Sequence, residues 1–328
     1  MSKKTKKDKK DAKSSILLLL ILAIVLIAST YAWFTSNQTV TVQQLEVNVE
    51  ARNGLQISTD AINWKSTLTT QDLAQTAVAA TYPTNVNQIP TTMEPVSTAG
   101  NITNGRLDMF HGVADPNDAT GEFDLTATKQ TDTQGVDGKY IAFDIFLQVN
   151  TPTDIKLSTN SSVVAVGDSK GLENASRVGL LQQGNVAPGT SHTVAQALNN
   201  GTAKDLFLWE PNSDVHTAAG VTNAFSVYGK TTTETGATPL AYNGIIKEFD
   251  KAAGVTIKNT NNQPTYFKAV TPNLVTPKVL AADQAYTKLE AGITKVRVYM
   301  WVEGEDVDCE NNASGIDIGY NLQFTIAQ

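Results

Sequence analysis

One short run of the sequence fits a nucleophile motif. Gly167–Gly171 matches the pattern G-x-S-x-G with Ser169 at its centre, and Asp205, Asp214 and His216 follow in the order found in α/β-hydrolases. That motif works only on a tight turn between a parallel strand and a helix. The alternating strands around Ser169 predict an antiparallel sheet instead, so we interpret the run as a turn and predict that the protein is not an enzyme. A secreted hydrolase that uses Ser169 as its nucleophile is kept as an alternative function.

A second run is strongly acidic. Glu303, Glu305, Asp306 and Asp308 lie within six residues, and carboxylate oxygens are the ligands that Ca²⁺ prefers. One hypothesis is therefore a calcium site in a loop between two strands; the other is a solvated hairpin loop whose charges keep the sheet edge from pairing with other chains. The run does not fit an EF-hand, because no glycine occupies the sixth position. Apart from calcium, the sequence predicts no cofactor.

The same acidic run holds the only cysteine of the chain, Cys309. An intrachain disulfide is thus excluded, and the acidic neighbours would raise the pKa of this thiol, which argues against a nucleophilic role. The sequence contains no HExxH, CxxC, Walker or GxGxxG motif.

The elements that must position these residues are mostly strands. Hydrophobic residues alternate with a period of two over 140–149, 296–302 and 316–326, as in half-buried strands. Further short strands are predicted at 54–58, 122–128, 154–159, 162–166, 177–181, 206–209, 225–229 and 255–258, and helices at 70–80, 192–200 and 281–292. Because no helix connects successive strands in the βα manner, we predict an all-β fold, an antiparallel β-sandwich or jelly roll with long loop insertions (85–137 and 229–265) and a few short helices, preceded by an N-terminal apolar helix.

Four aromatic residues fall on the second face of these strands: Tyr140, Phe146, Tyr299 and Trp301. They could bind sugars or a partner subunit. We favour the interpretation that they pack under a helix or an insertion.

The N-terminus indicates export. Seven lysines in residues 1–13 precede thirteen apolar residues, 16–28, which is typical of a signal peptide and short for a membrane span. Residues 1–32 are thus a signal peptide, cut by signal peptidase between Ala32 and Trp33, or else a membrane anchor. After cleavage, 296 residues would carry 18 Lys and Arg against 30 Asp and Glu, a net charge of −12 that argues against a nucleic-acid partner.

The hydrophobic alternation changes parity just after this segment. Val40 and Val42 are followed by Leu45 and Val47, so an extra residue at Gln43 or Gln44 turns the later side chains to the other face. Either one edge strand carries a β-bulge, or two strands meet here. In the second case residues 33–44 could complete the sheet of another subunit by donor-strand complementation, leaving 45–328 as the β-sandwich domain.

The run from Ala28 to Val49 resembles the export junction of the TasA/camelysin family of Gram-positive bacteria, which has a small-aromatic-Ala-aromatic-Phe segment and then Val/Leu alternation. The resemblance covers roughly residues 15–50. It implies a jelly-roll domain, cleavage after Ala32, a new N-terminus at Trp33 and Phe34, and a donor strand that includes Val40 and Val42.

The function that follows is an exported subunit of an extracellular fibre or biofilm matrix. It would be outside the cell or at its surface, would bind copies of itself head to tail, and would have a minor accessory matrix protein as a second partner to test. The alternative is a membrane-anchored surface module whose β-sandwich binds a ligand or a host surface.

Overall fold

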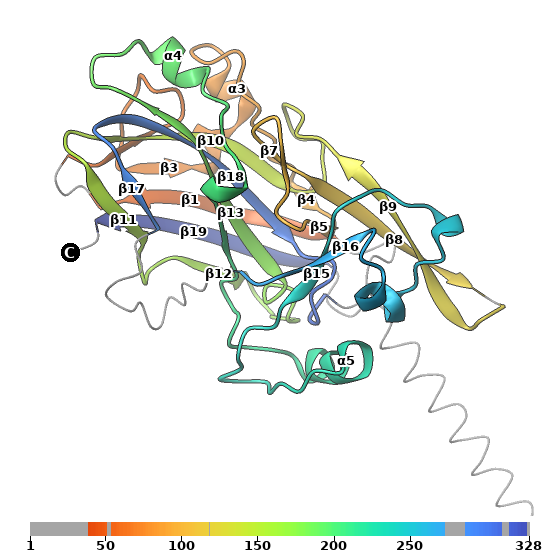
Figure 1. The fold of residues 1–328 in the computed structure, drawn as a ribbon. Helices are drawn as coiled ribbons and strands as arrows, with labels where there is room; N and C mark the ends of the chain where they lie inside the picture. The colour runs from red at the N-terminus through yellow and green to blue at the C-terminus, as the bar shows by residue number, and fades with distance from the viewer. Residues whose placement is uncertain (1–38, 51–53, 118, 273–285, 310–314, 327–328) are drawn as a thin grey trace, which may run out of the picture.

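The computed structural model describes residues 39–326 except for 51–53, 118, 273–285 and 310–314. This part consists mainly of strands with a few short helices, which confirms the all-β class (Figure 1). None of its helices has the length and apolar character needed to span a bilayer. The predicted signal peptide or anchor over residues 1–32, with its apolar helix, lies outside the described residues.

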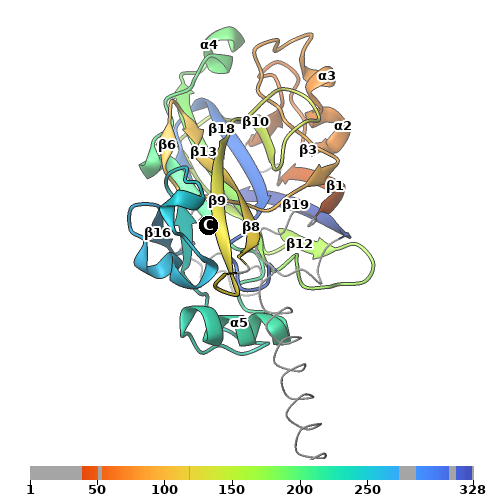
Figure 2. The same cartoon turned by 90° about the vertical axis from the view of Figure 1, so that its right-hand side faces the viewer.

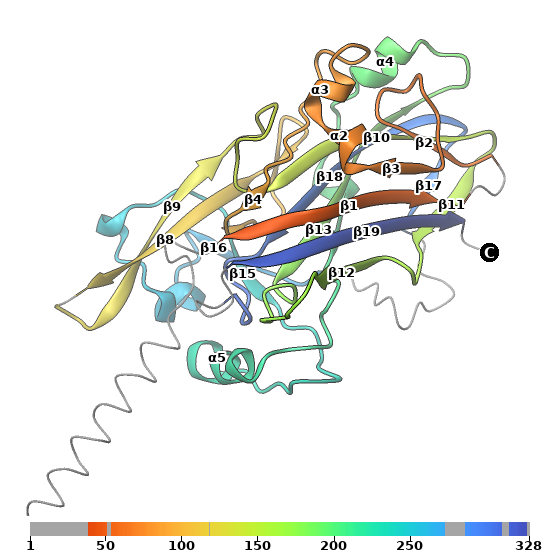
Figure 3. The ribbon, with the colours of Figure 1, turned by 180° about the vertical axis from the view of Figure 1, so that it is seen from behind.

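The larger sheet has seven strands and contains both the first and the last described strand (Figure 3). The order is β17-β11-β19-β1-β3, with β12 also beside β19 and β4 also beside β1. The strands are β1 (Val40–Val49), β3 (Thr67–Thr69), β4 (Thr92–Met93), β11 (Thr153–Leu157), β12 (Ser162–Ala165), β17 (Thr287–Leu289) and β19 (Ile316–Ile326). β1 pairs with β19 in parallel, so the prediction of purely antiparallel pairing is wrong at this pair. Alternation fixes which face a side chain takes, but it does not encode strand direction.

The second sheet has five strands, all paired antiparallel, in the order β14-β13-β18-β10-β2. These are β2 (Gln56–Ser58), β10 (Ile141–Val149), β13 (Ser176–Val186), β14 (Leu206–Trp209) and β18 (Gly292–Val302). Its inner side chains, such as Phe143 and Val298, form one buried cluster with Leu45 and Leu322 of the larger sheet. The main core therefore lies between the two sheets.

A further layer covers the outer face of the five-stranded sheet. Figure 2 shows the three layers: β16 of the further layer and β1 of the larger sheet lie on opposite sides of β18. Its strands come largely from the predicted insertions: β5 (Val96–Ser97), β6 (Ile102–Thr103), β7 (Arg106–Leu107), β8 (Met109–Asn117), β9 (Glu122–Gln130), β15 (Tyr242–Ile245) and β16 (Phe267–Val270). Tyr140, Tyr299 and Trp301 are buried against this layer. Phe146 packs with Tyr82 in a cluster of its own, so the packing interpretation of the four aromatics is confirmed.

Because of this cover, all eleven residues of β18 are buried, charged ones included. The expectation of a half-buried strand is wrong here. Alternation predicts one solvent-exposed face and one buried face, but both faces of β18 are buried. The outer face carries Lys295 and Arg297 together with aromatic side chains. The covering layer keeps water from Tyr299 and Trp301, whereas Lys295 is buried against Tyr82 and the carbonyls of Gln196 and Leu198.

The helices are short: α2 (Thr70–Leu73), α3 (Gln75–Val78), α4 (His192–Gln196) and α5 (Ala218–Tyr228), with 3₁₀ turns η1 (Ala203–Asp205), η2 (Lys251–Ala253) and η3 (Ile257–Asn262). The helices predicted at 70–80 and 192–200 are thereby confirmed in part. The strand predicted at 225–229 is the end of α5, which begins after the N-cap Thr217 and ends at Gly229 in the left-handed conformation. The strand predicted at 255–258 runs into η3, and the described end of the helix predicted at 281–292 contains β17.

Candidate functional site

The first described strand, β1, is an interior strand. It pairs with β19 from Val40↔Ile316 to Val49↔Phe324, and on its other side with β4 and then β3. Val40, Leu45 and Val47 are fully buried. We call the space between β19 on one side and β3 and β4 on the other the β1 slot. A sheet lacking β1 would have an open gap through its middle, with unpaired backbone groups along both walls.

A β-bulge divides β1 at the position where the alternation changes parity. The register runs Val42↔Ile318 and then Gln44↔Gly319, so Gln43 is the extra residue. The bulged-strand alternative is thus correct, but the strand is interior and not at the edge.

The predicted donor residues can now be placed. Val40 and Val42 complete the sheet of their own chain, on the same strand as residues 45–49, and so the boundary predicted at 44/45 falls inside β1. Trp33 and Phe34, and the cleavage residue Ala32, lie outside the described residues. The structure contains a single chain, and exchange of β1 between two copies stays a prediction.

The serine of the G-x-S-x-G run and the predicted histidine bind different partners. Ser169 is exposed, and its hydroxyl donates to the carboxylate of Glu173. His216 is buried, and its Nδ1 lies 2.7 Å from Oδ2 of Asp308. No helix separates Ser169 from β13, so the run lies in bends, as its interpretation as a turn requires.

The acidic run is not a solvated loop. We call Glu303–Cys309 the acidic segment; Glu303, Glu305, Asp306 and Asp308 are each at most 5% exposed. The segment follows β18, and the backbone N–H of Gly304 donates to the carbonyl of Val96, which holds the segment beneath β5. The hypothesis of a solvated hairpin loop is therefore wrong, because the covering layer buries this segment as well.

Three of the four carboxyl groups have different partners. Glu303 accepts from the indole N–H of Trp301 at 3.0 Å, Asp306 pairs with Arg177, and Asp308 binds His216. Within the described residues no three His, Cys, Asp or Glu side chains are arranged to hold a metal ion. The calcium prediction is thus left without a preassembled site in this part of the chain.

Burial shifts the protonation of this region. It raises the pKa of Glu303 to about 7 despite hydrogen bonds from Ser97 and Trp301, and the pKa of Glu210 to about 7 against the attraction of Arg177. Burial also raises the pKa of Glu305 well above its ordinary value. These groups hold protons at a pH where exposed carboxyl groups are ionised.

A second buried charge network was missed by the sequence analysis. Asp144 is fully buried on β10, where Oδ1 accepts from Nε of Arg297 at 2.8 Å and Oδ2 lies 3.2 Å from Nζ of Lys295. Tyr82 donates to the same carboxylate at 2.9 Å and accepts from Lys295 at 2.8 Å. Burial favours the neutral acid, but the two cations prevail and lower the pKa of Asp144 to about 2. The available clue was a charged residue within each of two predicted strands, Asp144 in 140–149 and Arg297 in 296–302.

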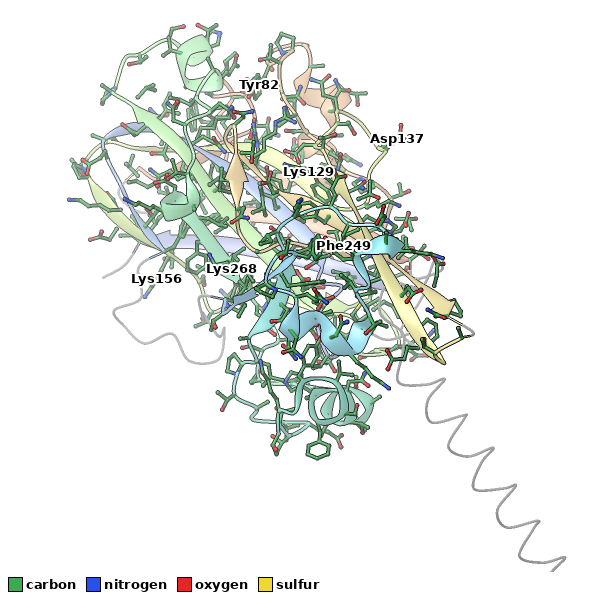
Figure 4. The ribbon with its side chains drawn as sticks, turned by 45° about the vertical axis from the view of Figure 1, so that its right-hand side comes forward. Tyr82, Lys129, Asp137, Lys156, Phe249 and Lys268 are labelled. Atoms are coloured by element: carbon green, nitrogen blue, oxygen red, sulfur yellow. The ribbon has the colours of Figure 1, made fainter. Side chains whose placement is uncertain are left out.

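The covering layer also has an open groove of about 600 Å³ beside β9 and η2. Phe249 and Tyr266 line it together with Lys247 and Glu248 (Phe249 is labelled in Figure 4). Aromatic faces with nearby polar groups suit a small polar ligand.

Neither a protein-family model, nor a curated protein, nor a solved structure matches this chain.

Proposed function

We propose that this protein is an exported structural subunit of an extracellular bacterial fibre or biofilm matrix. Its domain would be a β-sandwich of the jelly-roll kind, and assembly would proceed head to tail, with the N-terminal segment of one copy completing the sheet of the next. The predicted export segment and the resemblance at residues 15–50 motivate the proposal. It involves no catalysis.

The observation that carries the proposal is the position of β1. The strand lies at the N-terminal end of the described chain, yet its slot is in the middle of the larger sheet. A strand of this kind can be supplied by its own chain or by a neighbour with the same backbone hydrogen bonds, and a repeated head-to-tail exchange builds a filament. The bulge at Gln43 interrupts the pairing, and it is where we expect the exchanged part, Val40–Val42, to separate from the rest of β1.

The test is a pair of engineered cysteines across the slot, in a Cys309→Ser background. Val40→Cys and Ile316→Cys face each other in register. Neighbouring strands are about 4.8 Å apart, a spacing that a disulfide can bridge. Oxidised filaments should then give a ladder of covalent oligomers on a non-reducing gel, whereas a monomer closes the bond within one chain.

The matched control is Val47→Cys with Leu322→Cys, on the other side of the bulge. If exchange ends at the bulge, this pair links within the chain in filaments and monomers alike. Filaments in which the Val40 pair also links only within the chain would contradict exchange through β1, and the absence of filaments under electron microscopy would contradict the fibre function.

The alternative is a membrane-anchored surface module, and the groove at Phe249 is the observation that favours a ligand there. The N-terminal residue and intact mass of the protein from its native cells separate the two functions. A chain that begins at Trp33 supports the fibre. A chain that keeps residues 1–32 supports the anchored module, and the groove would then be tested by soaking with mono- and disaccharides.

A further inference from the structure

The chain between β14 and β15 forms an arm that carries α5. We call residues 210–241 the α5 arm; Figures 1 and 3 show α5 at one end of the molecule, clear of both main sheets. Along its length the arm binds the acidic segment. Thr217 donates its N–H and its hydroxyl to Oδ1 of Asp308 at 2.8 and 3.0 Å, Asn223 donates to the carbonyl of Val307 at 3.2 Å, and Tyr228 donates to the carbonyl of Glu305 at 3.1 Å.

The helix approaches the segment closely at Gly220. A Cβ atom on this residue would lie 2.1 Å from Oδ1 of Asp308, so that the helix or this buried carboxylate would have to move. On another side, Val227 and Tyr228 contact the apolar cluster around Phe249. Helix α5 is thus held by one apolar contact and by a set of polar contacts to the acidic segment, while Asn212, near the start of the arm, donates to the carbonyls of Val163 and Glu173.

The interface between arm and segment contains more acids than bases. Five carboxyl groups are buried there, and two cations face them: Arg177 binds Glu210 and Asp306, and His216 binds Asp308. The carboxyl groups are those of Glu210, Glu303, Glu305, Asp306 and Asp308. If all five ionised, their negative charges would outnumber these two cations by three, and Lys230, the other cation near Glu305, donates to the carbonyl of Ala241.

Glu305 is the extreme case. It is 1% exposed, and neither of its carboxyl oxygens has a hydrogen-bond partner in the described structure. It lines a cavity of about 10 Å³ together with His216, Tyr228 and Lys230, room for no more than about one water molecule. Nζ of Lys230 donates to the carbonyl of Ala241 at 2.6 Å and not to Glu305. A buried carboxylate with no partner is far less stable than the neutral acid.

The titratable and charged groups around Glu305 come from every element packed against it. Its own segment contributes Glu303, Asp306, Asp308 and Cys309, β13 contributes Arg177, the arm contributes Glu210, His216, Tyr228 and Lys230, and β15 contributes Tyr242.

We propose that the α5 arm is docked on the acidic segment only while Glu305 is protonated, and that ionisation of this group releases the arm. This inference goes beyond the fibre function and does not depend on it. Release would restore water to the carboxylate and relieve its repulsion from Glu303. Burial, and then the charge of Glu303, raises the pKa of Glu305, so this carboxyl group holds its proton while the arm is docked. With Glu210, Glu303 and Glu305 neutral, Arg177 and protonated His216 balance Asp306 and Asp308.

Hydrogen exchange tests the proposal, expressed as protection factors so that the pH dependence of intrinsic exchange cancels. Between about pH 5.5 and about pH 8.5, protection of the α5 amides should fall about tenfold or more, while β10 and β18 stay protected. Glu305→Gln cannot ionise and should keep α5 protected throughout. The matched control, Glu234→Gln, removes an exposed carboxylate of the same arm and should retain the wild-type pH dependence.

The proposal would be overturned by α5 protection that does not change with pH in the wild type, or by the same loss of protection in Glu305→Gln. Gly220→Ala, which forces the helix off Asp308, provides a second readout should Glu305→Gln fail to fold; it should give the unprotected α5 pattern already at the lower pH. Millimolar Ca²⁺ added at the higher pH tests whether a metal ion, instead of a proton, can neutralise Glu305. Protection of α5 that Ca²⁺ restores in the wild type at this pH would show that a metal ion can dock the arm while Glu305 is ionised, and would overturn the proton-based device.

Discussion

At the scale of single residues, the structure buries ionic groups in two different states. Asp144 is ionised and surrounded by Arg297, Lys295 and Tyr82, so each of its carboxylate oxygens meets at least one donor. Glu305 is buried to a similar extent, and its carboxyl oxygens meet no donor among the residues that the structure describes. The first arrangement is stable because its charges are paired, and the second is stable only as the neutral acid.

Asp144→Asn should destabilise the domain strongly. It removes the acid that pairs with two buried cations, and breaking a buried ion pair from one side costs about 3–5 kcal/mol. Chemical denaturation gives the free energy of unfolding. The control, Asp154→Asn on β11, replaces an exposed carboxylate and should change that free energy by less than about 0.5 kcal/mol. Equal losses in the two variants would show that the Asp144 network contributes little.

The sequence predicted the apolar residues of the site region better than the charged ones. Tyr140, Tyr299 and Trp301 were expected to lie beneath an insertion, because an aromatic side chain on a second strand face needs cover. Glu303 and Glu305 were expected in water or on a metal ion. Whether a carboxyl group is buried depends on the covering layer, which is built from residues that lie far away in the chain, such as Val96 and Tyr242. No local sequence pattern predicts that layer.

At the scale of elements, β1 illustrates how a parity change is accommodated. Val40 and Val42 precede the bulge, Leu45 and Val47 follow it, and the extra residue lets both halves turn their hydrophobic side chains toward the core. The position of the bulge was predictable from the alternation. The partner of β1 was not, because β19 lies at the other end of the chain and its pattern would serve a parallel or an antiparallel neighbour equally well.

Deletion of Gln43 should leave the domain folded. Without this residue, Val40, Val42, Leu45 and Val47 alternate regularly, and the register with β19 is retained on both sides. We expect a melting temperature equal to or above that of the wild type. Deletion of Glu46, in the regular half, is the control: it turns every residue before it to the opposite face and should unfold the domain or lower its melting temperature sharply. A Gln43 deletion as damaging as the Glu46 deletion would show that the bulge is required for the fold.

At the scale of the whole molecule, the layers decide how stability responds to pH. Burial raises the pKa of Glu210 and of Glu303 to about 7, so the folded state keeps protons that the unfolded state loses above about pH 4.5. Their stabilising contribution is complete below that pH and is lost as the pH rises to 7. His216 acts in the same direction: burial alone would lower its pKa, but the bond to Asp308 raises it.

Two carboxyl groups limit stability on the acid side. Burial would raise the pKa of Asp144 and of Asp60, but Arg297 in the first case and the backbone N–H groups of Asn63 and Ile62 in the second lower each pKa to about 2. The stability they contribute is present above about pH 4 and is lost as the pH falls toward 2. The two sets of groups together place the maximum of stability between about pH 4 and about pH 5.

Thermal unfolding across this range should therefore show a melting temperature that is highest near about pH 4.5 and declines steadily toward about pH 8. Repulsion within the acidic surface also grows as the pH rises. Two variants are therefore compared, to separate the effect of the buried groups on the melting temperature from the effect of net charge. Glu303→Gln should flatten the decline, since a buried group that cannot ionise contributes no pH dependence. Glu290→Gln removes the same charge from an exposed position and should leave the slope unchanged. A melting temperature that rises between about pH 5 and about pH 8, or slopes that are equal in the two variants, would show that the buried carboxyl groups do not control the stability of this domain.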